Sequence, residues 1–85
     1  MDRGAADLAL PEKAMELLRY AIRYQMRAGY MPTVREMAAR FGMKSTAGPR
    51  YYLRMLEARG YVVLARGLAR TMIITPGGRM AASGR

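Results

Sequence analysis

The sequence predicts a small, mainly α (α+β) domain in which three helices are followed by a β-hairpin. Three observations predict this class. Apolar residues recur at helical spacing over residues 11–59, glycines stand where each helical pattern stops, and β-branched residues replace that pattern after Gly60. The 85 residues suffice for one core. We therefore expect a folded domain at 11–75 between flexible segments at 1–10 and 76–85.

The first helix is predicted over residues 11–28. Pro11 fits the first helical position, where its missing N–H is harmless, and Gly29 fits the left-handed position after the last turn. Arginine recurs every four residues from Arg19 to Arg27, a row that fits either a solvated surface or the track of a phosphate backbone. The apolar stripe expected to face the core comprises Ala14, Met15, Leu17, Leu18, Ala21 and Ile22.

The second helix is predicted to begin at a capping box. Thr33 is a good N-cap, and Glu36 three residues later completes the T-x-x-E pattern in which each side chain binds the other residue's backbone N–H. The helix should continue to about Phe41, with Gly42 supplying a left-handed stop. Its expected buried residues are Val34, Met37, Ala38 and Phe41.

The start of the third helix depends on Pro49. A helix capped by Ser45 would place Pro49 inside it, where the ring clashes with the Ser45 carbonyl and a hydrogen bond is lost. A helix over residues 49–59, with Gly48 as N-cap, avoids both penalties. We therefore predict the later start. Its expected core residues are Leu53 and Leu56.

Two β-rich runs follow, at residues 61–64 and 71–75, with Gly67 as the turn residue between them. Three helices followed by a β-hairpin is the element order of a winged helix-turn-helix. In that fold the third helix enters the major groove and the hairpin wing lies along the backbone or the minor groove. The element order therefore indicates DNA binding.

Composition supports a polyanionic partner. Fifteen Lys and Arg against six Asp and Glu give a net charge of +9 and a pI of about 10.9. A solvated, arginine-rich surface is the alternative, because Lys13 and Lys44 are the only lysines. The chain has no Cys and no His, and its six acids form no catalytic constellation. We expect no enzyme activity, no cofactor, no metal and no membrane segment, and a cytoplasmic location.

Two segments carry a family resemblance: GYMPTVREMAARFGMKS at 29–45 and LRMLEARGYV at 53–62. Together they resemble the N-terminal DNA-binding domain of the LexA repressors, which typically shows GYPPSVREI and later HLxxLExKGYI. The match needs no gap over 29–62 and is looser over the first helix and the wing. It implies a double-stranded DNA-binding regulator.

LexA proteins add a domain whose Ser–Lys pair cleaves the chain and whose surface dimerises it. The 85 residues hold no such domain, so we expect neither property.

The predicted base contacts lie early in the third helix. Arg50 is the first choice, because arginine can bind guanine O6 and N7 together, worth roughly 1–3 kcal/mol of discrimination; a plain phosphate contact fits almost as well. Tyr51 could contact a thymine methyl group or a phosphate, or pack on the second helix. Arg54 is expected at phosphate. The family's Ser- and Asn-type base readers are replaced around Ala47, so the LexA operator is not implied.

Phosphate contacts are expected from the turn and the wing. Ser45 could instead only cap the helix, and Arg35 could pair with Glu36. Arg70 corresponds to a basic residue of the LexA wing. The full predicted set of DNA-binding residues is Arg35, Lys44, Ser45, Thr46, Ala47, Arg50, Tyr51, Arg54, Arg66 and Arg70.

The predicted function is sequence-specific binding of double-stranded DNA in transcriptional regulation. One copy binds a half-site weakly, so a homodimer or a partner is expected for tight binding. The alternative is a winged-helix interaction module that binds a protein of the transcription machinery.

Overall fold

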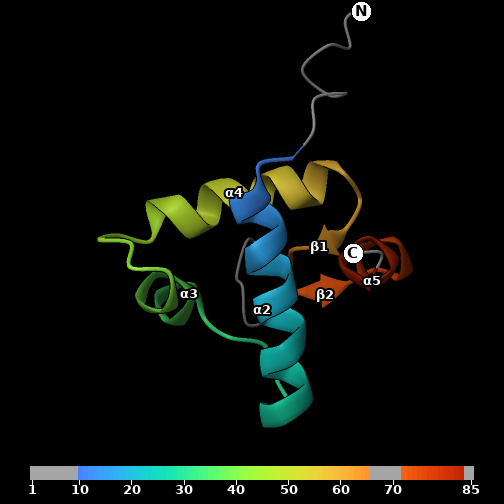
Figure 1. The fold of residues 1–85 in the computed structure, drawn as a ribbon, viewed down its shortest axis with the longest axis horizontal. Coiled ribbons are helices and arrows are strands. Elements are labelled where there is room, and N and C mark those ends of the chain that lie inside the picture. Colours follow the sequence, from blue (N-terminus) through green and yellow to red (C-terminus); the bar gives the residue numbers. More distant parts are fainter. Residues whose placement is uncertain (1–9, 66–71, 84–85) are drawn as a thin grey trace, which may run out of the picture.

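The computed structural model describes residues 10–65 and 72–83. Within these ranges, three helices precede a two-stranded antiparallel sheet and a further helix (Figure 1). This order confirms the predicted mainly α winged helix-turn-helix. The elements are α2 (Glu12–Ala28), α3 (Val34–Arg40), α4 (Ala47–Ala58), β1 (Val62–Val63), β2 (Ile73–Ile74) and α5 (Pro76–Ser83).

The helix α2 runs through the centre of the molecule, with α3, α4 and the sheet with α5 arranged around it (Figure 1). Its predicted stripe forms the middle of the core, since four of its residues are fully buried and Met15 and Ile22 lie at the edge. The other elements close the core from three sides. Its buried members are Ala14, Leu17, Leu18, Ala21, Met31, Met37, Leu53, Leu56, Val62, Met72 and Ile74.

The predicted helix boundaries around α2 and α3 are confirmed closely. Thr33 Oγ1 accepts the Glu36 N–H at 3.0 Å, and Glu36 Oε1 accepts the Thr33 N–H at 2.7 Å, which completes the capping box. Gly29 and Gly42 have φ angles of +88° and +68°, as expected for left-handed helix stops. Pro11 stands one position earlier than predicted, at the N-cap of α2.

The predicted start of the third helix was wrong by two residues. Helix α4 begins at Ala47 with Thr46 as N-cap, and Gly48 lies inside its first turn. Pro49 is therefore the third helical residue, where a backbone N–H has no partner within the helix and its loss costs nothing. Ser45 lies outside the helix, so the predicted clash does not arise.

The segment from Pro76, predicted as part of a flexible tail, instead forms the helix α5. Thr75 Oγ1 accepts the Gly78 N–H at 3.0 Å and donates to the Gly60 carbonyl at 2.6 Å. Gly78 is buried, and a Cβ there would lie 2.1 Å from the Tyr61 carbonyl oxygen. Close backbone contact and a threonine cap thus hold a helix whose sequence has little periodicity. At the other end, residues 1–9 lie outside the described ranges, and Leu10 packs against the core.

Candidate nucleic-acid interface

Four of the predicted DNA-binding residues surround one surface hollow between α3 and the following turn. The hollow has a volume of about 440 Å³. Ala38 and Ala39 contribute small side chains to its lining. No acidic side chain lines it. The complete lining is Arg35, Ala38, Ala39, Met43, Lys44, Ser45 and Thr46.

The local sequence explains why these residues meet. Arg35 is the second residue of α3, so the capping box at Thr33 fixes where its side chain leaves the helix. Gly42 then reverses the chain with φ +68°, and the Met43 N–H donates to the Ala38 carbonyl at 2.8 Å. The reversal returns Lys44 to the side of α3. Both basic side chains are exposed, so two positive charges stand at the mouth of the hollow.

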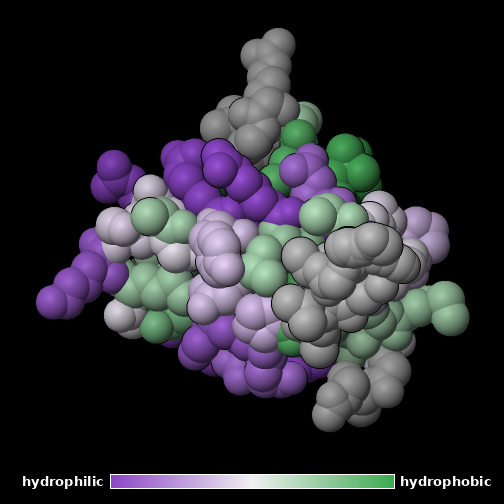
Figure 2. Space-filling model, turned by 90° about the horizontal axis from the view of Figure 1, so that it is seen from above, coloured by the Kyte–Doolittle hydropathy of each residue, from purple (hydrophilic) through white to green (hydrophobic). Residues whose placement is uncertain are grey.

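The remaining candidates on α4 form an exposed face beside the hollow. Ala47, Arg50, Tyr51 and Arg54 are all exposed, and each lies three or four residues from two of the others. Arg50 Nε donates to Thr46 Oγ1 at 3.4 Å. Tyr51 is 60% exposed, and its ring centroid lies 5.3 Å from that of Tyr52 on the same helix. Figure 2, seen from the side where α4 lies, shows hydrophilic side chains interspersed with pale and apolar ones.

The N-terminus of α4 offers few backbone donors to an anion. The Ala47 N–H already donates to Ser45 Oγ at 3.2 Å, although the N-cap of α4 is Thr46 and not Ser45. Pro49 has no N–H, and the Arg50 N–H donates to the Thr46 carbonyl at 3.1 Å. Side-chain charge must therefore supply most of the attraction for phosphate here.

The predicted wing residues Arg66 and Arg70 lie outside the described residues. The described base of the wing is the ladder in which Val62 faces Ile74 and Val63 faces Ile73. Val62 and Ile74 point into the core, whereas Val63 and Ile73 are 49% and 61% exposed. The contacts of the two wing arginines stay predictions.

Residues 8–71 match the family model of the LexA DNA binding domain. The chain belongs to this family. The LexA repressor of Anaeromyxobacter sp. (strain Fw109-5) is 34% identical over 71 residues, which cover 84% of this chain and 31% of the relative. The LexA repressor of Desulfatibacillum aliphaticivorans is 35% identical over 81 residues, covering 89% of this chain and 40% of the relative. The chain thus spans well under half the length of these relatives.

This LexA-type domain also contains interface residues that the sequence did not indicate. A Cβ at Gly48 would lie 2.7 Å from Met43 Sδ, so Met43 packs over the first turn of α4 and links the turn to that helix. The methionine itself gave no signal. The sequence signal that could have revealed this contact is Gly48, whose missing side chain leaves room for Met43. The sequence interpretation assigned Gly48 as the N-cap instead.

Other kinds of site find little support in residues 10–65 and 72–83. Acidic side chains there form no group of three or more that could hold a metal ion. Within the same ranges, none of the helices has the length and apolar character needed to cross a membrane. The hollow and the α4 face both lie within the residues 8–71 that match the family model, and together they form the candidate site.

Proposed function

We propose that this LexA-type domain binds double-stranded DNA sequence-specifically and acts as a transcriptional repressor. The observation that carries the proposal is the hollow that unites Arg35 with the turn residues Lys44–Thr46, directly beside the exposed face of α4. The family match and the repressor relatives support it. A helix with its side chains is about 10–12 Å wide, and the major groove is about 12 Å wide, so α4 fits that groove.

The geometry suggests a division of roles. Arg50 and Tyr51 lie on the exposed face of α4 and would face base edges in the major groove. Lys44 and Arg35, at the mouth of the hollow, would bind a phosphate on the groove's edge, with Arg54 at a second phosphate. Phosphate contacts orient a protein on the duplex, and base-edge contacts choose the sequence.

The wing would complete the interface. Arg66 and Arg70 would lie at the backbone or in the adjacent minor groove, where a narrow groove attracts arginine. A single domain then reads one half-site, and two copies on paired half-sites would give tight binding. We therefore infer that the DNA-bound form is a homodimer or a complex with a partner.

An unbiased binding-site selection tests the proposal. The full chain would be incubated with random duplex DNA at fixed salt, and the selected duplex would be compared with random duplex in an equilibrium binding assay. We expect the selected sequence to bind about a thousandfold more tightly. Equal affinity for both duplexes would refute sequence-specific binding, and paired half-sites in the selected sequences would indicate two copies.

A further inference from the structure

A second hollow lies between α2 and α5, on a part of the surface that the DNA proposal does not use. Its volume is about 320 Å³. None of its lining residues comes from α3, the turn or α4, and α5 lies beyond the residues 8–71 that match the family model. We refer to it as the α2–α5 groove, and its lining is Arg19, Ile22, Arg23, Arg79, Ala82 and Ser83.

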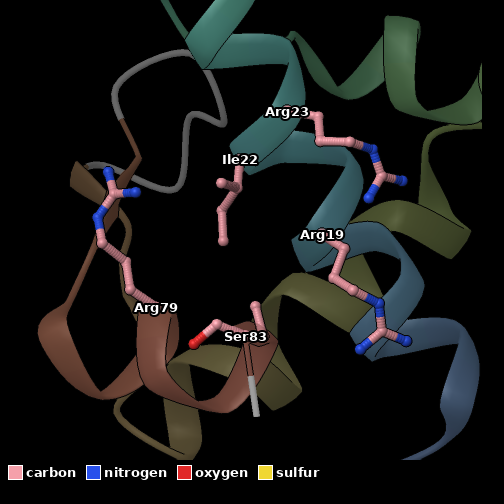
Figure 3. Close-up of a pocket in the computed structure, with 6 residues that line it drawn as sticks. Arg19, Ile22, Arg23, Arg79 and Ser83 are labelled. Carbon is pink, nitrogen blue, oxygen red and sulfur yellow. The ribbon is translucent and has the colours of Figure 1, made fainter. Parts of the chain in front are cut away.

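The groove has an apolar centre and cationic margins. Ile22 points into its middle, while the guanidinium groups of Arg19 and Arg23 lie on one side and that of Arg79 lies on the other (Figure 3). The methyl group of Ala82 adds to the apolar floor. A phosphate needs hydrogen-bond donors that converge on it, whereas these three groups diverge. The chemistry is therefore poorly suited to a nucleic-acid backbone.

The margins of the groove carry a net positive charge. Arg23 is exposed, and no ion pair involves it or Arg79 in the described part of the chain. Arg19 pairs with Glu12 Oε2 at 2.6 Å, yet its Nη1 is buried without a hydrogen-bond partner. Carboxylates brought to these margins would meet Arg23 and Arg79, which are exposed and have no acidic partner in the described part of the chain. The buried Nη1 of Arg19 lies out of their reach.

The groove is preformed. Arg79 Nη2 donates to Gln25 Oε1 at 3.2 Å and ties α5 to α2. The buried Gly78 and the Thr75 cap fix α5 against the start of β1. An occupant would not have to order this part of the protein, which lowers the entropic cost of binding.

We propose that the α2–α5 groove binds an acidic amphipathic segment of a partner protein. One apolar side chain would lie over Ile22 and Ala82, with carboxylates beside Arg23 and Arg79. The volume of about 320 Å³ is at the small end of the range of ligand pockets and is sufficient for one anchoring side chain. The inference rests on charge complementarity around an apolar centre, and it stands whether or not α4 reads DNA.

Display of random peptides on phage against the immobilised full chain provides the test. An excess of random duplex DNA in the binding buffer blocks nucleic-acid surfaces. We expect the enriched peptides to combine several Asp or Glu with one Leu, Ile or Phe. A synthetic peptide of the consensus sequence should shift the backbone amide resonances of Ile22, Ala82 and Ser83. Enrichment without an acidic and apolar consensus, or shifts confined to α3 and α4, would overturn the proposal.

Two charge reversals on the exposed side of α2 distinguish binding in the groove from an effect of the protein's net charge. Arg23→Glu alters a groove margin, whereas Arg27→Glu makes the same change one turn later, outside the lining. We expect Arg23→Glu to weaken the peptide about tenfold and Arg27→Glu to leave it nearly unchanged. Equal loss in both variants would reduce the effect to general electrostatics and refute the groove.

Other occupants give distinguishable results. If Arg23→Glu weakened duplex DNA as strongly as the peptide, the groove would be a polyanion surface and the proposal would fail. If Arg23→Glu abolished a concentration-dependent dimer seen by sedimentation, a second copy would be the occupant, and the proposal would fail as well. Circular dichroism and the unfolding midpoint confirm that each variant is folded.

Discussion

The Tyr24 hydroxyl on α2 donates a hydrogen bond to Oε1 of Glu36 on α3, over 3.2 Å. The same oxygen accepts the Thr33 N–H at 2.7 Å. One carboxylate oxygen therefore completes the cap of α3 and also attaches that cap to the central helix. Because Arg35 leaves α3 beside this cap, the position of a proposed phosphate contact depends on the shared acceptor.

Replacing Tyr24 by Phe tests this attachment. The ring would keep its edge contact with Tyr20, whose centroid is 5.8 Å away, and would lose the bond to Glu36. We expect the free energy of unfolding to fall by about 1 kcal/mol, as measured by urea denaturation. Tyr51→Phe is the control, because that side chain is 60% exposed. Identical urea midpoints for Tyr24→Phe and the wild type would show that the bond adds no net stability.

Two adjacent glycines in α5 should respond oppositely to alanine. At Gly78 a Cβ would lie 2.1 Å from the Tyr61 carbonyl oxygen, whereas at Gly77 the nearest atom, Thr75 Oγ1, is 3.7 Å away. Gly78→Ala should destabilise the domain by about 1–3 kcal/mol through overpacking. Gly77→Ala should be neutral or stabilise by up to about 1 kcal/mol, since alanine favours helix. Thermal unfolding measures both, and equal effects would contradict the close docking of α5.

These contrasts show what the sequence could predict. The capping box at Thr33 and the stop at Gly29 are local signals, and the structure follows them. The helix α5 was missed because Pro76 and two glycines carry little helix propensity. It exists through contacts with distant residues, such as the bond from Arg79 to Gln25 across 54 positions. No local pattern contains such contacts.

The candidate site was predictable in part for the same reason. Arg35 and Lys44 were identified by charge and by their place in the helix-turn-helix. The two residues lie around one hollow only because of the conformation of the turn, which includes the hydrogen bond from the Met43 N–H to the Ala38 carbonyl. The start of α4 was predicted wrongly because Pro49 was assigned to the first helical position. With Thr46 as the N-cap, Pro49 is the third helical residue and is still tolerated there.

Lys44→Ala tests the phosphate role of the hollow. Each phosphate contact contributes about −0.9 to the slope of log K against log[salt], so the variant should reduce the magnitude of that slope by about 0.9. Affinity should fall by a similar factor for the selected duplex and for random duplex. Titrations at several salt concentrations measure the slope. Arg27→Ala, which removes an exposed charge from the end of α2, is the control, and an equal change in its slope would argue against a specific contact.

Arg50→Ala tests base reading by α4. Arg50 lies in the second turn of α4, and Thr46 Oγ1 accepts from its Nε at 3.4 Å, a long bond that a guanine could replace. The variant should lose roughly 1–3 kcal/mol of discrimination at one base pair, while its affinity for random duplex changes little. Arg54→Ala, one turn later on the same face, should instead weaken all duplexes alike. Repeating the site selection with each variant separates the two roles, since relaxed preference at one position is expected from Arg50→Ala alone. The reverse pattern would exchange the roles assigned to these two arginines.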